Sequence, residues 1–330
     1  MILIISTEKD QSTDLVIDWL ERLDKPFIRI NENSLVSGFS LDLSTEQTDY
    51  TFSFHDSLGI PRRVRYSEVE SIWYRRGTLQ VPAPKIKTNN NPTGVALKES
   101  LELQGYYEAI NIRDFIFDSF KDKKHIGSFY DNTLNKLYCL KKASEIGLLI
   151  PRSTVCSSKK EVLDFFDKVA PNKVITKSLA HGSMDVAGAF GIGAGTIVVD
   201  REKVNEASPR FFHSLFQEYI DKKVELRIFY LAGTCYAAAL HSQMDATTSI
   251  DFRNYSQTRP TRISPYNLPD EVNEKIKQLM QALDLVSGSL DLILTPANEY
   301  YFLEINPIGQ FGWISKKCNF HLEKKIAEFL

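Results

Sequence analysis

Residues 289–307 read SLDLILTPANEYYFLEINP, and this stretch decides the fold. Two apolar runs flank a short polar turn, which predicts a β-hairpin. A turn centred just after Ala297 places Asp291 directly opposite Glu304 on the neighbouring strand. Asn306 lies two residues beyond Glu304, so the period of two places it on the same face. The sequence therefore predicts three oxygen-bearing side chains on one patch of sheet.

Paired carboxylates on a sheet indicate a cation. Like charges set opposite each other destabilise a sheet unless a cation lies between them, and an all-oxygen set of ligands suits Mg²⁺. Asp291, Glu304 and Asn306 are therefore candidate metal ligands. The alternative is a solvated hairpin face with ordinary acidic residues, and the triad alone does not decide between the two.

Length and composition are those of an ordinary globular protein. The 330 residues suffice for about two to three domains. With 43% hydrophobic residues, 25% charged residues and a formal net charge of −2, the chain shows no sign of disorder, and its charge argues against bulk nucleic-acid binding. No apolar run approaches the ~18 residues of a membrane span, and Met1–Ile5 is too short for a signal peptide.

The cysteines and histidines lack metal-binding spacing. The six histidines form no HExxH motif, which argues against a zinc site. The cysteines form no CxxC pair and predict reduced thiols in a cytoplasmic protein. They are Cys139, Cys156, Cys235 and Cys318.

The first domain, expected at 1–120, begins like a parallel α/β unit. It lacks the GxGxxG motif, so dinucleotide binding is not supported. Its expected elements are strand 2–5, helix 14–23, strand 27–30, hairpin 41–54, strand 71–76 and helix 95–120.

The second part of the chain, from 121 on, alternates helices with strands. Asp131 or Asn132 is expected to cap a helix that runs to Ile146. Ser158 and Glu161 form a capping box for the next helix. The further expected elements are strand 173–179, a glycine-rich stretch 181–196, strand 197–200, segment 216–220, hairpin strands 225–231 and 235–240, and helix 269–283.

Several cations and one polar segment are candidates for nucleotide binding. Lys177 ends an apolar strand beside the glycine-rich stretch, a position suited to a phosphate. The segment Gln217–Ile220 is a linker of the kind that presents backbone groups to an adenine edge. Glu225 and Arg227 share a strand face, and a simple ion pair is the alternative there. Arg253, in a loop, suits a phosphate or a carboxylate.

In this order, the features resemble the ATP-grasp superfamily over residues 121–330. They are the lysine-bearing helix that ends at Gly147, the strand lysine, the glycine stretch, Gln-Glu-Tyr-Ile, Glu-x-Arg and Asp…Glu-x-Asn. The resemblance implies an α/β (α+β) ATP-grasp fold with an N-terminal pre-ATP-grasp domain (1–120), a central subdomain (121–216) and a C-terminal subdomain (217–330), with ATP between the last two. It implies that Lys136 and Lys177 bind ATP phosphates, that Gln217, Glu218, Tyr219, Ile220 and Glu225 bind adenosine, and that Asp291, Glu304 and Asn306 hold Mg²⁺.

Within that superfamily the chain is most similar to the graspetide (microviridin-type) peptide macrocyclases, closest to the grasp-with-spasm peptide maturases. The residues that carry this likeness are WYRR (73–76), YDNTLNK (130–136), SQ (242–243), DFR (251–253), NPIGQF (306–311) and CNF (318–320).

The likeness implies an ADP-forming carboxylate–amine or carboxylate–alcohol ligase. Its substrate would be a ribosomal precursor peptide, with a leader and a core. Asp or Glu side chains of the peptide would be activated as acyl phosphates and closed into esters or amides with Thr, Ser or Lys. Arg227 and Arg253 would orient the carboxylate. No nucleic acid or membrane partner is expected, and a homodimer is expected from the family alone.

Three alternatives remain open. A different ATP-grasp ligase, adding amino acids to a protein or joining small molecules, would share every nucleotide residue. A regulatory protein with a degenerate site is disfavoured by the complete set of lysines and carboxylates. An unrelated α/β protein is disfavoured by the order of the features. Ring number and size, ester or amide linkage, and the leader-docking residues do not follow from the sequence.

Overall fold

The computed structural model describes residues 1–46, 48–83, 85–87, 91–179, 183–186, 190–193, 195–241 and 261–330, with the backbone alone at 132, 133, 183–186 and 190–193. Arg253, Ser242, Gln243 and much of the glycine-rich stretch lie outside this part of the chain. The structure divides into two compact units, Met1–Asn132 with His321–Leu330, and Thr133–Phe320. The boundaries expected at 120 and 216 stay predictions.

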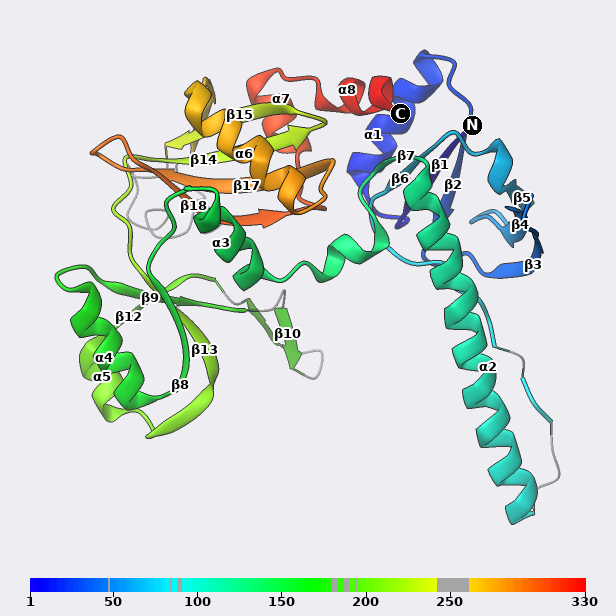
Figure 1. Cartoon of the computed structure of the whole chain (residues 1–330), viewed down its shortest axis with the longest axis horizontal. Helices are drawn as coiled ribbons and strands as arrows, with labels where there is room; N and C mark the ends of the chain where they lie inside the picture. The colour runs from blue at the N-terminus through cyan, green and yellow to red at the C-terminus, as the bar shows by residue number, and fades with distance from the viewer. Residues whose placement is uncertain are drawn as a thin grey trace. The chain divides into compact units, whose positions relative to one another are not determined.

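The first unit is built on a parallel sheet in the order β2-β1-β6-β7 (Figure 1). Its strands are β1 (Ile2–Ser6), β2 (Phe27–Asn31), β6 (Ser71–Tyr74) and β7 (Lys124–Ile126). A second, antiparallel sheet consists of β3 (Val36–Leu43), β4 (Thr48–His55) and β5 (Pro61–Arg65). The sequence predicted the strands at β1, β2 and β6 and the hairpin, but not β5 or β7.

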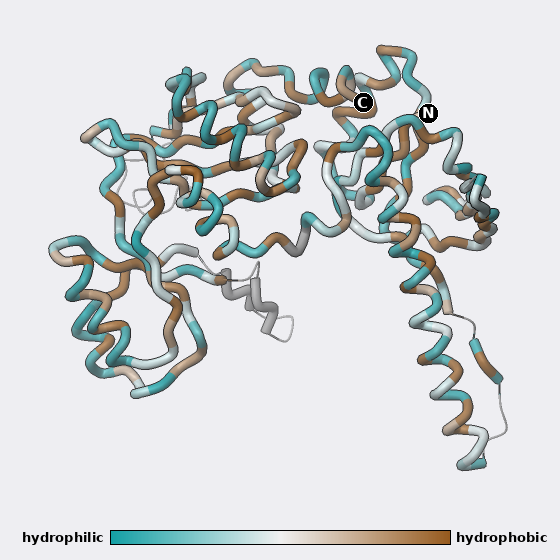
Figure 2. The backbone as a smooth tube through the Cα atoms, in the orientation of Figure 1, coloured by the Kyte–Doolittle hydropathy of each residue, from teal (hydrophilic) through white to brown (hydrophobic). Residues whose placement is uncertain are grey.

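The α-helices in the described part of this unit are α1 (Gln11–Arg22), α2 (Pro92–Ser119) and α8 (Leu322–Phe329). Helix α1 begins earlier than expected because the Asp10 side chain accepts a hydrogen bond from the Ser12 N–H, an N-cap interaction. Most of α2 is exposed, and apolar and polar residues alternate along it in Figure 2. In the described ranges, no helix is both long and apolar enough to cross a membrane. Short 3₁₀ helices lie at Tyr66–Glu68, Phe120–Asp122 and Phe129–Thr133.

In the described residues of the second unit, two larger antiparallel sheets and one two-stranded sheet are present (Figure 1). The four-stranded sheet has the order β12-β9-β13-β8 and is covered by α4 (Lys159–Val169) and α5 (Arg201–Glu206). Its strands are β8 (Ser153–Ser158), β9 (Val174–Lys177), β12 (Ile197–Val199) and β13 (Arg210–Glu218). Strands β10 (Ser183–Val186) and β11 (Phe190–Gly193) form a separate hairpin.

The larger sheet has the order β16-β15-β14-β17-β18. Its strands are β14 (Val224–Leu231), β15 (Thr234–His241), β16 (Arg262–Tyr266), β17 (Ser287–Leu294) and β18 (Tyr300–Asn306). Helices α3 (Lys136–Glu145) and α6 (Asp270–Ala282) pack on one face, where Leu226, Ile276 and Leu292 belong to one buried core. Helix α7 (Gly312–Cys318) follows β18. The opposite face carries the polar side chains of Glu225 and Arg227 in β14, while Phe229 of the same strand packs on Phe311.

Three local predictions have clear outcomes. The capping box is confirmed, because Ser158 accepts from the Glu161 N–H and its hydroxyl contacts the Glu161 carboxylate. The predicted cap at Asp131 or Asn132 is wrong. Asn135 caps α3 by accepting from the Leu137 and Tyr138 N–H groups, while the Asp131 carboxylate instead accepts from Ser128. All four cysteines are free thiols, as the sequence predicted.

Candidate functional site

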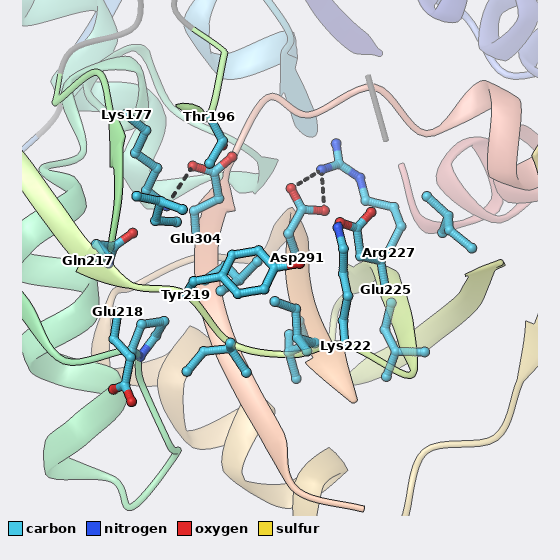
Figure 3. A pocket seen from close by; sticks show the side chains of 18 residues that line it. Lys177, Thr196, Gln217, Glu218, Tyr219, Lys222, Glu225, Arg227, Asp291 and Glu304 are labelled. Atoms are coloured by element: carbon cyan, nitrogen blue, oxygen red, sulfur yellow. Dashed lines mark hydrogen bonds and ion pairs between the residues drawn. The ribbon is translucent and has the colours of Figure 1, made fainter. Parts of the chain in front are cut away.

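A cleft lies in the second unit, between the four-stranded and the five-stranded sheet (Figure 3). The small sheet contributes Ile175, Lys177 and Gln217, and the large sheet contributes polar residues from β14, β17 and β18. Its apolar walls include Pro151, Leu240, Leu292 and Ile293. The cleft therefore brings together residues that are more than 100 positions apart in the chain.

The hairpin of β17 and β18 places the two predicted carboxylates face to face. Asp291 is the partner of Glu304, which confirms the predicted pairing. The reason differs from the prediction, since Leu294 pairs with Tyr300 and the turn is thus centred on Ala297. A β-bulge at Leu303 then adds one residue to β18 and restores the pair.

The bulge also decides which side chains enter the core. Phe302 and Ile305 are both buried against the helices, although they are three residues apart and regular alternation would put them on opposite faces. With Leu303 as the extra residue, Glu304 turns to the cleft with Asp291.

Each of these carboxylates contacts a cation from elsewhere in the unit. Nη1 of Arg227 donates to both oxygens of Asp291, at 2.8 and 2.9 Å. Oε2 of Glu304 lies 3.5 Å from Nζ of Lys136 and 3.8 Å from Nζ of Lys177. In Figure 3 the Lys177–Glu304 contact and the Arg227–Asp291 contact lie next to each other in the cleft. All five side chains are less than one-fifth exposed, so solvent screens these charges less than it screens surface pairs.

Asn306 has a definite backbone partner. It pairs with Ser289 in the sheet, one step beyond Glu304, and its Oδ1 accepts a hydrogen bond from the Ile308 N–H at 3.1 Å. Among the described residues no group of three or more His, Cys, Asp or Glu side chains converges. A metal ion here would therefore rest on Asp291, Glu304 and Asn306 together with oxygens of a bound ligand. Such hard oxygen donors fit Mg²⁺.

The predicted linker Gln217–Ile220 is partly strand, because Gln217 and Glu218 end β13. Gln217 is buried, and its Nε2 donates to the Ser153 hydroxyl at 2.8 Å. Its Oε1 has no hydrogen-bond partner among the described residues and is available to a donor in the cleft. The Glu218 carboxylate turns away from Glu304 and accepts from Asn172 and from the Arg152 N–H.

Lys222 is a charged cleft residue that sequence reasoning missed. Its buried ammonium forms an ion pair with Glu225, which also lines the cleft. Burial raises the pKa of nearby Tyr219, and the Asp221 and Glu225 carboxylates raise it further. No sequence signal separates Lys222 from its neighbour Lys223. The predicted face-sharing of Glu225 and Arg227 is confirmed, but these two residues pair with different partners.

Arg75, in the first unit, forms a buried ion pair. Its Nε lies 3.0 Å from Oδ2 of Asp10, and both side chains are at most 4% exposed. Burial lowers the pKa of Arg75 to about 10, against the opposing effect of Asp10. Asp10 also caps α1, so the pair holds the end of β6 against the start of that helix.

Comparison with known proteins gives two family matches. Residues 1–129 match the model of the MvdD pre-ATP-grasp domain, and residues 133–330 match the model of the RimK-like ATP-grasp domain. The search of curated proteins finds no match.

Solved structures with the same fold cover essentially the whole chain. The macrocyclase MdnC from Microcystis aeruginosa MRC, bound with the precursor peptide MdnA, is 25% identical, with a TM-score of 0.75 and coverage of 100% of this chain and 99% of MdnC. A RiPP-associated ATP-grasp ligase from Chryseobacterium gregarium, in complex with ADP and a leader and core peptide, is 24% identical, with a TM-score of 0.78 and coverage of 99% and 94%. The macrocyclase MdnB from the same Microcystis is 22% identical, with a TM-score of 0.67 and coverage of 100% and 98%.

Proposed function

We propose, from the premise that this chain belongs to the RimK-like ATP-grasp family, that it is an ATP-dependent peptide macrocyclase. It would activate Asp or Glu side chains of a ribosomal precursor peptide and join them to Thr, Ser or Lys side chains of the same peptide. The observation that carries the proposal is the opposed Asp291–Glu304 pair in the cleft, with Glu304 in contact with Lys136 and Lys177. The N-terminal match and the likeness to MdnC, a macrocyclase bound with its precursor, favour this substrate class.

ATP would lie in the cleft between the two sheets. The free acceptor Oε1 of Gln217 suits the amino group of adenine, and the backbone of Tyr219 and Ile220 offers further edge contacts. The Glu225 carboxylate suits the ribose hydroxyls. Lys136 and Lys177 would bind the phosphates, exchanging one Glu304 oxygen for phosphate oxygens.

Asp291, Glu304 and Asn306 would hold Mg²⁺, which when bound neutralises charge on the phosphates during transfer. Glu304 would then give up its contacts with the ammonium groups of Lys136 and Lys177. When Mg²⁺ replaces the lysines at Glu304, both ammonium groups become available to bind the phosphates. They stay close to the place where negative charge develops, and they need little rearrangement to reach it.

The reaction would proceed in two steps. A carboxylate oxygen of the peptide attacks the γ-phosphorus, the bond to the β–γ bridging oxygen breaks, and ADP leaves with an acyl phosphate formed. A hydroxyl or amine of the same peptide then attacks the acyl carbon. Inorganic phosphate leaves, the attacking group loses its proton, and an ester or amide remains.

Arg227 would orient the acyl phosphate or the carboxylate. It presents a guanidinium to the cleft beside Asp291, and a planar guanidinium matches a carboxylate or phosphate in two hydrogen bonds. Arg253 is proposed for the same task from the resemblance alone, since it lies outside the described residues.

The test is to trap the activated carboxylate. The protein is incubated with a precursor peptide, ATP, Mg²⁺ and hydroxylamine, and the peptide is analysed by mass spectrometry. We expect peptide hydroxamates on Asp or Glu side chains and one ADP per activated carboxylate. AMP as the nucleotide product would contradict the reaction class. Addition of free amino acids to the peptide would instead support an amino-acid-adding ligase.

A further inference from the structure

Two adjacent lysines near the cleft differ in their surroundings. Lys223 is exposed, and its ammonium lies 3.2 Å from the Asn298 side-chain oxygen. The Lys222 side chain is only 2% exposed and pairs with Glu225. Both members of that pair line the cleft (Figure 3). The chain therefore buries one of two otherwise similar cations at the edge of the proposed nucleotide site.

Burying this pair has a cost that the fold alone does not repay. Removing an ammonium and a carboxylate from water costs several kcal/mol per ion, and their mutual attraction offsets this only when the geometry is good. A pair of apolar residues would stabilise the same place at least as well. The presence of two buried charges here therefore points to a task for the carboxylate.

Glu225 lies on the same strand face as Arg227, two residues along β14. Arg227 is engaged by Asp291, its partner across the sheet. Lys222 gives Glu225 a cation of its own, so the Glu225 carboxylate does not compete with Asp291 for the guanidinium. Since a carboxylate has about four acceptor positions, it can contact Lys222 and still accept two further hydrogen bonds.

We propose that Lys222 is a positioning residue that fixes the Glu225 carboxylate for the two ribose hydroxyls of the nucleotide. The Lys222–Glu225 pair thereby makes the site selective for ribonucleotides over deoxyribonucleotides. The inference rests on the proposed ATP site, and it adds a residue and a specificity to it.

The experiment measures equilibrium binding of ADP, 2′-deoxyADP and 3′-deoxyADP in the presence of Mg²⁺ by titration calorimetry. The wild-type protein is expected to bind ADP about 10- to 100-fold more tightly than either deoxy analogue, since each hydroxyl bonds a charged acceptor. Glu225→Gln and Lys222→Met should both reduce that preference to near unity. Lys223→Met is the matched control and should keep it. Lys222→Arg keeps a cation beside Glu225 and should retain part of the preference for ADP.

A double variant guards against simple loss of folding. Lys222→Met/Glu225→Gln removes both charges together, so it leaves neither ion buried without a partner. It should fold and show no more loss of ADP affinity than Glu225→Gln alone.

Two results would overturn the inference. Weaker binding of all three nucleotides in Lys222→Met with an unchanged ratio would mean that Lys222 acts on the phosphates or on the fold. A Glu225→Gln variant that still prefers ADP would remove the carboxylate from ribose binding. Failure of the wild-type protein to bind any of the three nucleotides would instead count against the proposed function.

Discussion

At the scale of single residues, three carboxylates of the cleft are each paired with a cation. Glu304 contacts two lysines, Asp291 an arginine and Glu225 a third lysine. Such matching keeps buried charges tolerable in the absence of ligand. If a phosphate and a metal ion bind, the lysines exchange Glu304 for phosphate oxygens, and Glu304 exchanges the lysines for the metal ion. No charge is then left without a partner.

Replacing Glu304 with Gln tests this arrangement most simply. The substitution keeps the shape of the side chain and removes its charge, so the fold should persist, with a lower Tm because Lys136 and Lys177 lose their carboxylate partner. Peptide-dependent ATP turnover should fall by about 100-fold or more, the loss typical when one group that stabilises transition-state charge is removed. Glu299→Gln, on the exposed turn of the same hairpin, should behave as wild type. Full turnover in the Glu304 variant would contradict the metal assignment.

Arg75 and Arg76 make a second matched comparison. Arg75→Met leaves the buried Asp10 carboxylate without its closest cation, so we expect a loss of about 3–5 kcal/mol in the free energy of unfolding. Arg76, with a side chain 42% exposed and 3.8 Å from the same carboxylate, should cost about 1 kcal/mol or less when replaced by Met. Urea unfolding measures both. Equal losses of unfolding free energy in the two variants would show that the Arg75–Asp10 ion pair contributes no more to stability than the Arg76–Asp10 contact.

Sequence patterns predicted cleft residues unevenly at this scale. Asp291, Glu304 and Lys177 were found because a carboxylate or lysine inside an apolar strand is unusual. Lys222 was missed because its polar surroundings, Asp221-Lys222-Lys223, look like a solvated turn. Its burial depends on how β13 leads into β14, which is a tertiary property.

At the scale of elements, the β17–β18 hairpin is the structure on which the site depends. The apolar runs on both sides of Pro296 made the hairpin predictable. The bulge at Leu303 was not predictable, because Tyr-Phe-Leu-Glu-Ile offers no glycine or proline to mark it. What selects the bulge is the demand that both Phe302 and Ile305 enter the core.

Gly309 follows this hairpin and is closely surrounded. A Cβ at this position would overlap the Ser289 side chain and lie 3.0 Å from the Asn306 carbonyl oxygen. Gly309→Ala should therefore destabilise the protein by about 1–3 kcal/mol through overpacking and weaken Mg²⁺ binding. Gly288→Ala is the control, since its Cβ would come no closer than 3.2 Å to the Ile305 and Met280 side chains. The affinity for Mg²⁺ is measured by calorimetric titration with ADP present. Equal Mg²⁺ affinity in the Gly309→Ala and Gly288→Ala variants would contradict this prediction.

At the scale of the whole molecule, the last ten residues of the chain pack in the same compact unit as its N-terminal part. Helix α8 packs with α1 in the first unit, and the Lys25 ammonium donates to the Ala327 and Glu328 carbonyls. The Ser71 hydroxyl donates to the Leu330 carbonyl. The sequence pattern alone groups these last residues with the C-terminal subdomain, because a short amphipathic helix carries no sign of the surface that it covers.

Ile326 tests the importance of that return. It is 1% exposed, so Ile326→Ala should cost about 2–5 kcal/mol. Hydrogen exchange should show faster exchange in β1 and α1, with α6 in the second unit unaffected. Glu328→Ala, an exposed change on the same helix, should leave exchange unchanged. Uniform acceleration across both units would contradict the division of the chain.

The intact mass of a precursor peptide after co-expression with this protein tests the central claim most directly. We predict that the peptide loses the mass of one water for each ring closed, and that it keeps its full mass with the Glu304→Gln variant. A peptide that gains amino-acid residues, or that keeps its full mass with the wild-type protein, would contradict peptide macrocyclisation.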